Sequence, residues 1–94
     1  MIVRLTQDLS KGFVSWKEMY FENQAALEAL GGKLIFAGPR KEDDNKMVVL
    51  IDFDSPEAMK AFATNEELKA KRVAAGAILE SNVVTVMGDE SFTG

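Results

Sequence analysis

The sequence contains no histidine and no cysteine, and these two absences exclude several kinds of chemistry. Without cysteine there is no disulfide framework and no thiol nucleophile, and without both residues there is no zinc site of the Cys/His type. The usual general base near neutral pH, an imidazole, is missing as well. We therefore expect any proton transfer to rely on a tyrosine or a carboxylate, and we expect no metal and no cofactor.

Long apolar runs and positive charge are also scarce. No apolar run reaches the roughly 18–20 residues that span a bilayer. Arg4 and Asp8 interrupt the N-terminal stretch before the apolar part of a signal peptide could form. The formal net charge of -4 argues against a protein that binds the phosphates of nucleic acids. These features predict a cytoplasmic protein that has neither nucleic acid nor a membrane as a partner.

The chain has the size and composition of one globular domain. Its 94 residues are 47% hydrophobic and 28% charged, so we expect a single domain over residues 1–94. A chain this short buries only about 60–65% of its unfolded surface. Further burial against a partner subunit would therefore stabilise it.

Helix starts, turn residues and apolar segments follow one another in the order βαββαβ. Ser10 is expected to cap the first helix, and Ser55 with Pro56 to begin the second. Gly31 and Gly76 are expected where these helices end. The predicted strands cover residues 2–6, 33–37, 47–53 and 83–87, and the predicted helices cover residues 11–30 and 56–75, the second with a break at Thr64 or Asn65.

This order predicts an α+β fold of the ferredoxin-like type, a four-stranded antiparallel sheet with the helices on one face. The third strand is apolar on both faces. Val48 and Leu50 point to one face, and the other face carries Met47, Val49, Ile51 and Phe53. The chain's own helices can cover only one face. We therefore predict a homodimer that forms through the sheet faces.

Two segments resemble the dimeric α/β-barrel superfamily, in which two ferredoxin-like protomers pack sheet against sheet. In residues 48–62, a strand ending in Asp52-Phe53 precedes Ser55-Pro56-Glu57-Ala58, as at the junction of the third strand and second helix in many small members. The spacing of Phe13, Trp16 and Tyr20 is similar to the first helix of an uncharacterised bacterial branch of small stand-alone barrels.

The resemblance implies a range of activities and no single one. The superfamily includes cofactor-free monooxygenases of polyketide quinones, muconolactone isomerase-like proteins and haem-degrading enzymes that bind iron through histidine. The last group does not fit a chain without histidine. We expect a protein that binds a small apolar, conjugated molecule, as a cofactor-independent monooxygenase or an isomerase. The alternative is a non-enzymatic module for ligand sensing or assembly.

The first predicted helix carries an apolar stripe with one amide in it. Trp16 and Tyr20 lie on the same side, and Asn23 follows on the next turn. The stripe is either the face packed on the sheet or the wall of a pocket between helices and sheet. Asn23 either bonds a backbone group at a sheet irregularity or lines that pocket.

Arg72 leans toward the apolar side of the last helical segment. It either extends to solvent or binds an anion at the mouth of the pocket. The ligand-binding hypothesis therefore comprises Trp16, Tyr20, Asn23 and Arg72, with no catalytic residue assigned.

Three further features have structural interpretations. Arg4 and Asp52 are expected on the uncovered sheet face, paired with each other or across the dimer. Val14 and Phe21 lie off the apolar stripe and are either exposed or in contact with the partner's C-terminal segment. The acidic residues 42–44 are expected to form a solvated turn.

Overall fold

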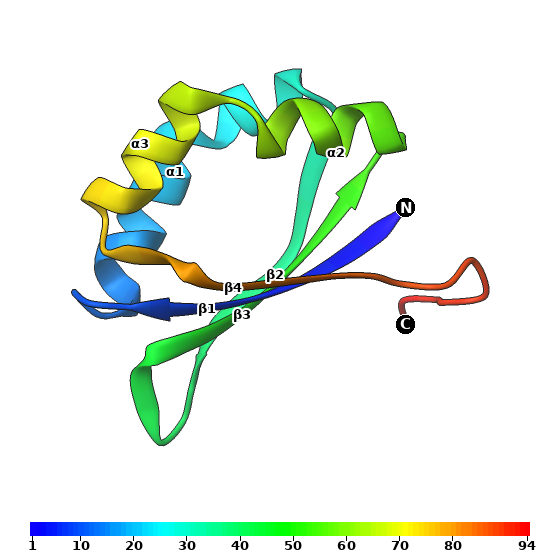
Figure 1. Cartoon of the computed structure of the whole chain (residues 1–94). Helices are drawn as coiled ribbons and strands as arrows, with labels where there is room; N and C mark the ends of the chain where they lie inside the picture. Colours follow the sequence, from blue (N-terminus) through cyan, green and yellow to red (C-terminus); the bar gives the residue numbers. More distant parts are fainter.

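The computed structural model describes every residue from Met1 to Gly94, and the chain folds around one antiparallel sheet (Figure 1). The sheet has four strands in the order β2-β3-β1-β4, so β2 and β4 are its edges. All helices lie on the same side of the sheet (Figure 1). None of them is long and apolar enough to span a bilayer. The elements are β1 (Ile2–Leu9), α1 (Phe13–Ala29), β2 (Gly32–Arg40), β3 (Asp43–Phe53), α2 (Pro56–Ala63), α3 (Glu66–Ala74) and β4 (Ala77–Val86).

The predicted ferredoxin-like βαββαβ order is confirmed, with two short helices between β3 and β4. Ser55 caps α2, since its hydroxyl accepts the Ala58 N–H at 3.1 Å. Asn65 restarts the helix as α3, since its side-chain oxygen accepts the Leu68 N–H at 3.0 Å. Gly76 turns the chain into β4 with a φ of 104°.

The core lies between α1 and the two central strands. Val49, Ile51 and Phe53 on β3 face the helices and are at most 3% exposed. Val3 on β1 is paired with Ile51 and completes this row. Trp16 and Leu27 on α1 pack on it from above. The alternation on β3 therefore buries one face, as predicted.

The start of α1 differs from the prediction. Ser10 does not cap the helix; its hydroxyl bonds the Gly76 carbonyl at 3.3 Å. Gly12, with a φ of 83°, occupies the cap position instead. The Phe13 N–H donates to the Asp44 carboxylate at 3.0 Å. The prediction of a solvated turn over residues 42–44 is therefore wrong for Asp44, which lies in β3 and caps a helix remote in sequence.

All four strands are longer than predicted, and β3 begins at Asp43 and not at Met47. β1 continues past Thr6 to Leu9, and β2 continues through Gly38-Pro39 to Arg40. The largest correction concerns β4, which begins at Ala77 and not at Val83. Polar residues at positions 80–82 interrupt the apolar pattern, and a large register shift against β1 accommodates them.

The uncovered face of the sheet is partly apolar, as expected. Phe36 on β2 is 53% exposed and is paired with Leu50, and Val83 on β4 is 56% exposed. The predicted pair between Arg4 and Asp52 is not formed within the chain. Asp52 instead binds the N-terminal ammonium group at 3.0 Å. Asp52 is opposite Ile2 and Arg4 is opposite Leu50, so the two side chains are diagonal neighbours on the sheet.

Candidate functional site

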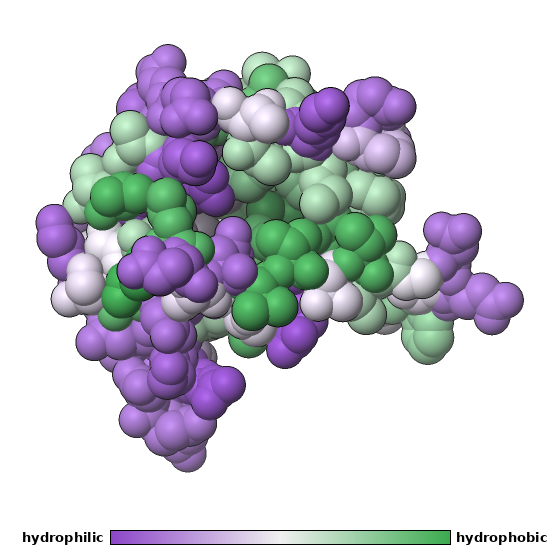
Figure 2. All heavy atoms as spheres, viewed as in Figure 1, coloured by the Kyte–Doolittle hydropathy of each residue, from purple (hydrophilic) through white to green (hydrophobic).

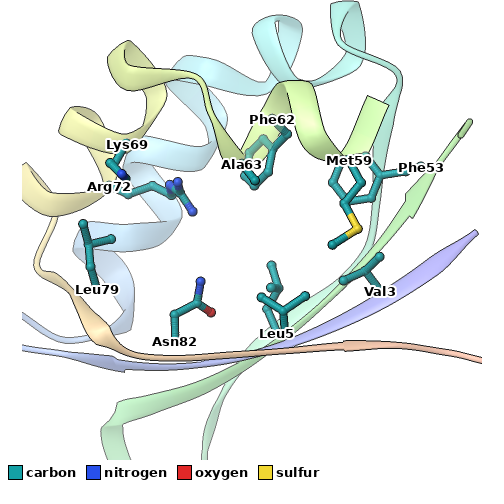
Figure 3. A pocket seen from close by; sticks show the side chains of 11 residues that line it. Val3, Leu5, Phe53, Met59, Phe62, Ala63, Lys69, Arg72, Leu79 and Asn82 are labelled. Carbon is teal, nitrogen blue, oxygen red and sulfur yellow. The ribbon is translucent and has the colours of Figure 1, made fainter. Parts of the chain in front are cut away.

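A cavity of about 310 Å³ lies between the helices and the concave face of the sheet (Figure 3). Apolar side chains gather in the region between β4 and the helices (Figure 2). The volume is at the lower end of the range usual for ligand pockets. The sheet provides Val3, Leu5, Phe53, Leu79, Asn82 and Val84, and α2 and α3 provide Met59, Phe62, Ala63, Lys69 and Arg72.

Arg72 reaches into this cavity from α3. Its guanidinium carbon lies 4.9 Å from the centre of the Phe62 ring, which is a cation–π contact. Its Nε is buried and has no hydrogen-bond partner. Burial lowers the pKa of the guanidinium below its ordinary value, although the group remains a cation at neutral pH. An anion placed beside Nε would therefore be attracted and would supply the missing partner.

Asn82 faces Arg72 from β4 on the other wall of the cavity (Figure 3). Its Oδ1 is also buried without a partner. These are the two unpartnered buried side-chain atoms of the chain, and both belong to residues that line the same cavity. Buried polar atoms are usually satisfied, so an unpaired donor and an unpaired acceptor around one hollow indicate a place for a polar ligand group.

The predicted site residues meet around a second, smaller cavity of about 40 Å³. Trp16 and Tyr20 are stacked along α1, with ring centres 5.9 Å apart and planes at 12°. Asn23 and Arg72 line the same space. Arg72 and Phe62 line both cavities, whereas the three α1 residues do not reach the larger one. The structure thus brings the predicted residues together beside the main hollow.

Asn23 bonds neither a sheet irregularity nor a buried partner from another element. Its Nδ2 donates to the Met19 carbonyl of its own helix at 2.8 Å. The role considered for Asn23 at a sheet irregularity is filled by Gln7, which is 6% exposed and bonds the irregular part of β4.

Tyr20 is a hydroxyl donor and not a base in this setting. Burial is the main cause that raises the pKa of its phenol, and the nearby Glu28 carboxylate raises it further. A phenol with a raised pKa keeps its proton at neutral pH. Its side chain also meets Phe21 edge to face, with ring centres 5.3 Å apart.

The charged side chains that line the cavity of about 310 Å³ are both cationic. Arg72 and Lys69 line it and no acidic side chain does. The chain has no group of three acidic residues placed to hold a metal ion. The arrangement can bind and stabilise an oxyanion on an otherwise apolar molecule, which is what a preorganised donor site does for an enolate.

Sequence reasoning missed Asn82, Leu79 and the wall formed by α2. The available signal was a polar cluster at residues 80–82 immediately before an apolar strand. That cluster resembles a loop, because the pattern alone does not show which of its side chains turns inward.

Fold and site together define a class: a ferredoxin-like α+β domain with a hollow between its helices and its sheet. Solved structures share this fold over nearly the whole chain. An antibiotic biosynthesis monooxygenase matches with a TM-score of 0.66 and 13% identity, covering 97% of this chain and 100% of its own. SnoaB, a cofactor-independent oxygenase from Streptomyces nogalater, matches with a TM-score of 0.63 and 10% identity over 97% and 93%.

A third match has a different description. An uncharacterized NIPSNAP domain protein from Burkholderia xenovorans has a TM-score of 0.59 and 15% identity over 99% and 100% of the two chains. No family model matches the sequence, and no curated protein is significantly similar to it. At these identities the likeness establishes the fold alone.

Proposed function

We propose that this chain is the one-domain protomer of a dimeric α/β barrel that binds a flat, apolar, conjugated molecule carrying an acidic oxygen. The observation that supports this is the cavity of about 310 Å³, with Arg72 Nε and Asn82 Oδ1 unpaired at its walls. An oxyanion beside Arg72 and a hydroxyl beside Asn82 would satisfy both atoms. The apolar walls would bury the remainder of the molecule.

The activity that fits this site best is cofactor-independent oxygenation or isomerisation. Both reactions begin with loss of a proton from an activated carbon, which leaves an enolate. A buried guanidinium stabilises that negative charge as it develops. The solved oxygenases that share the fold support this assignment.

A non-enzymatic ligand sensor is the second candidate. One observation favours it: no carboxylate lines the main cavity, so the chain offers no evident base for the proton transfer there. Trp16, Tyr20 and Asn23 would then shape the adjoining space and Arg72 would hold the ligand.

The partner surface we propose is the uncovered sheet face, in a cytoplasmic homodimer. Phe36 and Val83 are more than half exposed on that face, and monomers rarely expose large apolar patches. The acidic net charge of -4 makes nucleic acid an improbable partner. Light scattering on a size-exclusion column tests the dimer, and a clean monomer at micromolar concentration would contradict it.

Lawsone, a hydroxynaphthoquinone that ionises to a delocalised oxyanion, is a suitable probe. We expect its addition to raise the Tm in proportion to the logarithm of its concentration, and the parent naphthoquinone without the hydroxyl to act more weakly. Arg72→Met should weaken lawsone binding about tenfold, whereas the same charge change at exposed Lys60 should not. A Tm that neither quinone changes would overturn the proposal.

Turnover of anthrone separates the two candidates. In the oxygenation, its activated CH2 becomes a carbonyl with one oxygen atom of O2, and the two hydrogens leave with the other atom as water. Oxygen uptake that depends on the protein and on Arg72 supports the enzyme. Lawsone binding without any uptake supports the sensor.

A further inference from the structure

The edge strand β4 contains a large irregularity opposite β1. Thr6 is paired with Val83, and Asp8 is paired with Ile78. Gln7 alone on β1 therefore faces residues 79–82 on β4. An ordinary bulge places two residues opposite one, so this insertion is unusually large and must be held by bonds outside the ladder.

The side chains of Gln7 and Ser81 supply those bonds. Gln7 Nε2 donates to the Ile78 carbonyl at 2.6 Å and to Ser81 Oγ at 2.9 Å. Ser81 Oγ donates to the same carbonyl at 2.6 Å and accepts the Asp8 N–H at 2.8 Å. The hydroxyl thus uses its donor and both acceptor positions, and it replaces the ladder partner that the insertion removes from Asp8.

The insertion determines which side chains of β4 face the cavity. Leu79 and Asn82 both line it, one near each end of the insertion. In a regular strand, residues three apart would point to opposite faces of the sheet. The insertion is therefore what allows both side chains to face the helices.

We propose that Gln7 and Ser81 are positioning residues that hold Asn82 toward Arg72 and so set the affinity of the site for a ligand bearing a hydroxyl beside an oxyanion. This inference rests on the proposed function. Gln7 is the one polar residue of the chain that is buried. None of its side-chain hydrogen bonds is made to the core between α1 and β3. All of them are made to the backbone or side chains at the insertion.

Matched variants at Ser81 test the proposal. Ser81→Ala removes the hydroxyl, and Ser81→Thr retains it on a residue suited to strands. With lawsone as the probe, we expect the Kd to rise about fivefold in Ser81→Ala and to recover in Ser81→Thr. Asn82→Ala should weaken binding by a similar factor.

The double variant distinguishes positioning from general stability. If Ser81 acts through Asn82, adding Ser81→Ala to Asn82→Ala should not raise the Kd further, although the losses in Tm should still add. A merely structural role would lower the Tm and leave the Kd within twofold of the unchanged chain. That outcome, or fold-changes that multiply, would overturn the proposal.

A second measurement needs no ligand. The chain has no cysteine, so Asn82→Cys introduces a single thiol, with exposed Glu80→Cys as the reference. We expect the thiol at position 82 to react at least about tenfold more slowly than that at position 80, and the difference to shrink when Ser81→Ala is added. If lawsone does not bind at all, the proposed function fails while these rates still decide the positioning. Equal rates with and without Ser81→Ala would contradict it.

Discussion

The space between the helices and the sheet is nearly filled under α1, where a cavity of only about 40 Å³ remains, and is hollow beneath α2 and α3 where β4 passes. On the filled side, Leu27 is 5% exposed and packs in one cluster with Ile51. On the hollow side, Leu79 and Val84 line a cavity of about 310 Å³, and Val84 is 46% exposed. One sheet therefore carries a packed core and an open cavity next to each other.

β4, which lines the hollow side, is less regular than β1 and β3, which lie under both sides. β1 and β3 are paired without a register shift from Ile2 to Asp8, so their alternating apolar residues form a continuous surface facing the helices. β4 loses that register opposite Gln7 and brings a polar residue, Asn82, to the inner face. The cavity therefore adjoins the part of the sheet where the regular pairing is broken.

Two leucine substitutions, one on each side, test whether the sides differ in packing, and they have the largest expected effect on stability. Leu27→Ala should lower the free energy of unfolding by about 2–5 kcal/mol, because it opens a void in a packed core. Leu79→Ala removes the same atoms from the wall of an existing hollow and should cost less than about 1.5 kcal/mol. Urea unfolding at equal protein concentrations measures both. Equal losses would mean that the hollow is closed in solution.

Removal of the Asp44 carboxylate that caps α1 should have the next largest effect on stability. Asp44→Ala removes the acceptor of the Phe13 N–H and should cost about 1 kcal/mol, since α1 has no side-chain cap of its own. Glu42→Ala, in the same turn, is the control and should change the free energy of unfolding by less than about 0.5 kcal/mol. Equal losses in the two variants would contradict the cap and would show that the two acidic residues act only through their charge.

The filled side of the molecule was predictable from the sequence, and the hollow side only in part. The alternation on β3, the Ser55-Pro56 start of α2 and the exit at Gly31 are local signals that tertiary structure did not override. These signals were sufficient for the fold. They also predicted a pocket between the helices and the sheet, where the structure has a cavity that Arg72 lines.

Asn82 and the cap by Asp44 were not predictable, for the same physical reason. Each depends on a contact between segments far apart in the chain: Asp44 meets Phe13, and the insertion that turns Asn82 inward is held by Gln7. Local patterns show that polar residues leave the regular alternation. They do not show which remote backbone groups those residues will satisfy.

The substitution Asn23→Leu tests whether the Asn23 amide has a buried partner outside its own helix, and its expected effect on stability is small. Its amide bonds the Met19 carbonyl, which the helix backbone already engages, so Asn23→Leu leaves no group newly unpaired. We expect the free energy of unfolding to change by less than about 0.5 kcal/mol in either direction. Thermal unfolding measures it, with Gln24→Leu on the same helix as the comparison. A loss of about 1–3 kcal/mol would instead indicate a buried partner in another element.

The smallest effect concerns the titration of Tyr20, which is the only tyrosine and can be followed by ultraviolet absorbance. Its pKa is raised in the fold, first by burial and then by Glu28, so the unfolded chain gives up this proton at a lower pH than the folded one. Stability should therefore be unaffected below the ordinary tyrosine pKa of about 10 and should fall as the pH rises past it. Glu28→Gln should lower the measured pKa only in part, because burial is the larger cause. A full return to the ordinary value in that variant would show that the phenol is open to water, and that the filled side is less closed than the cavity beside it.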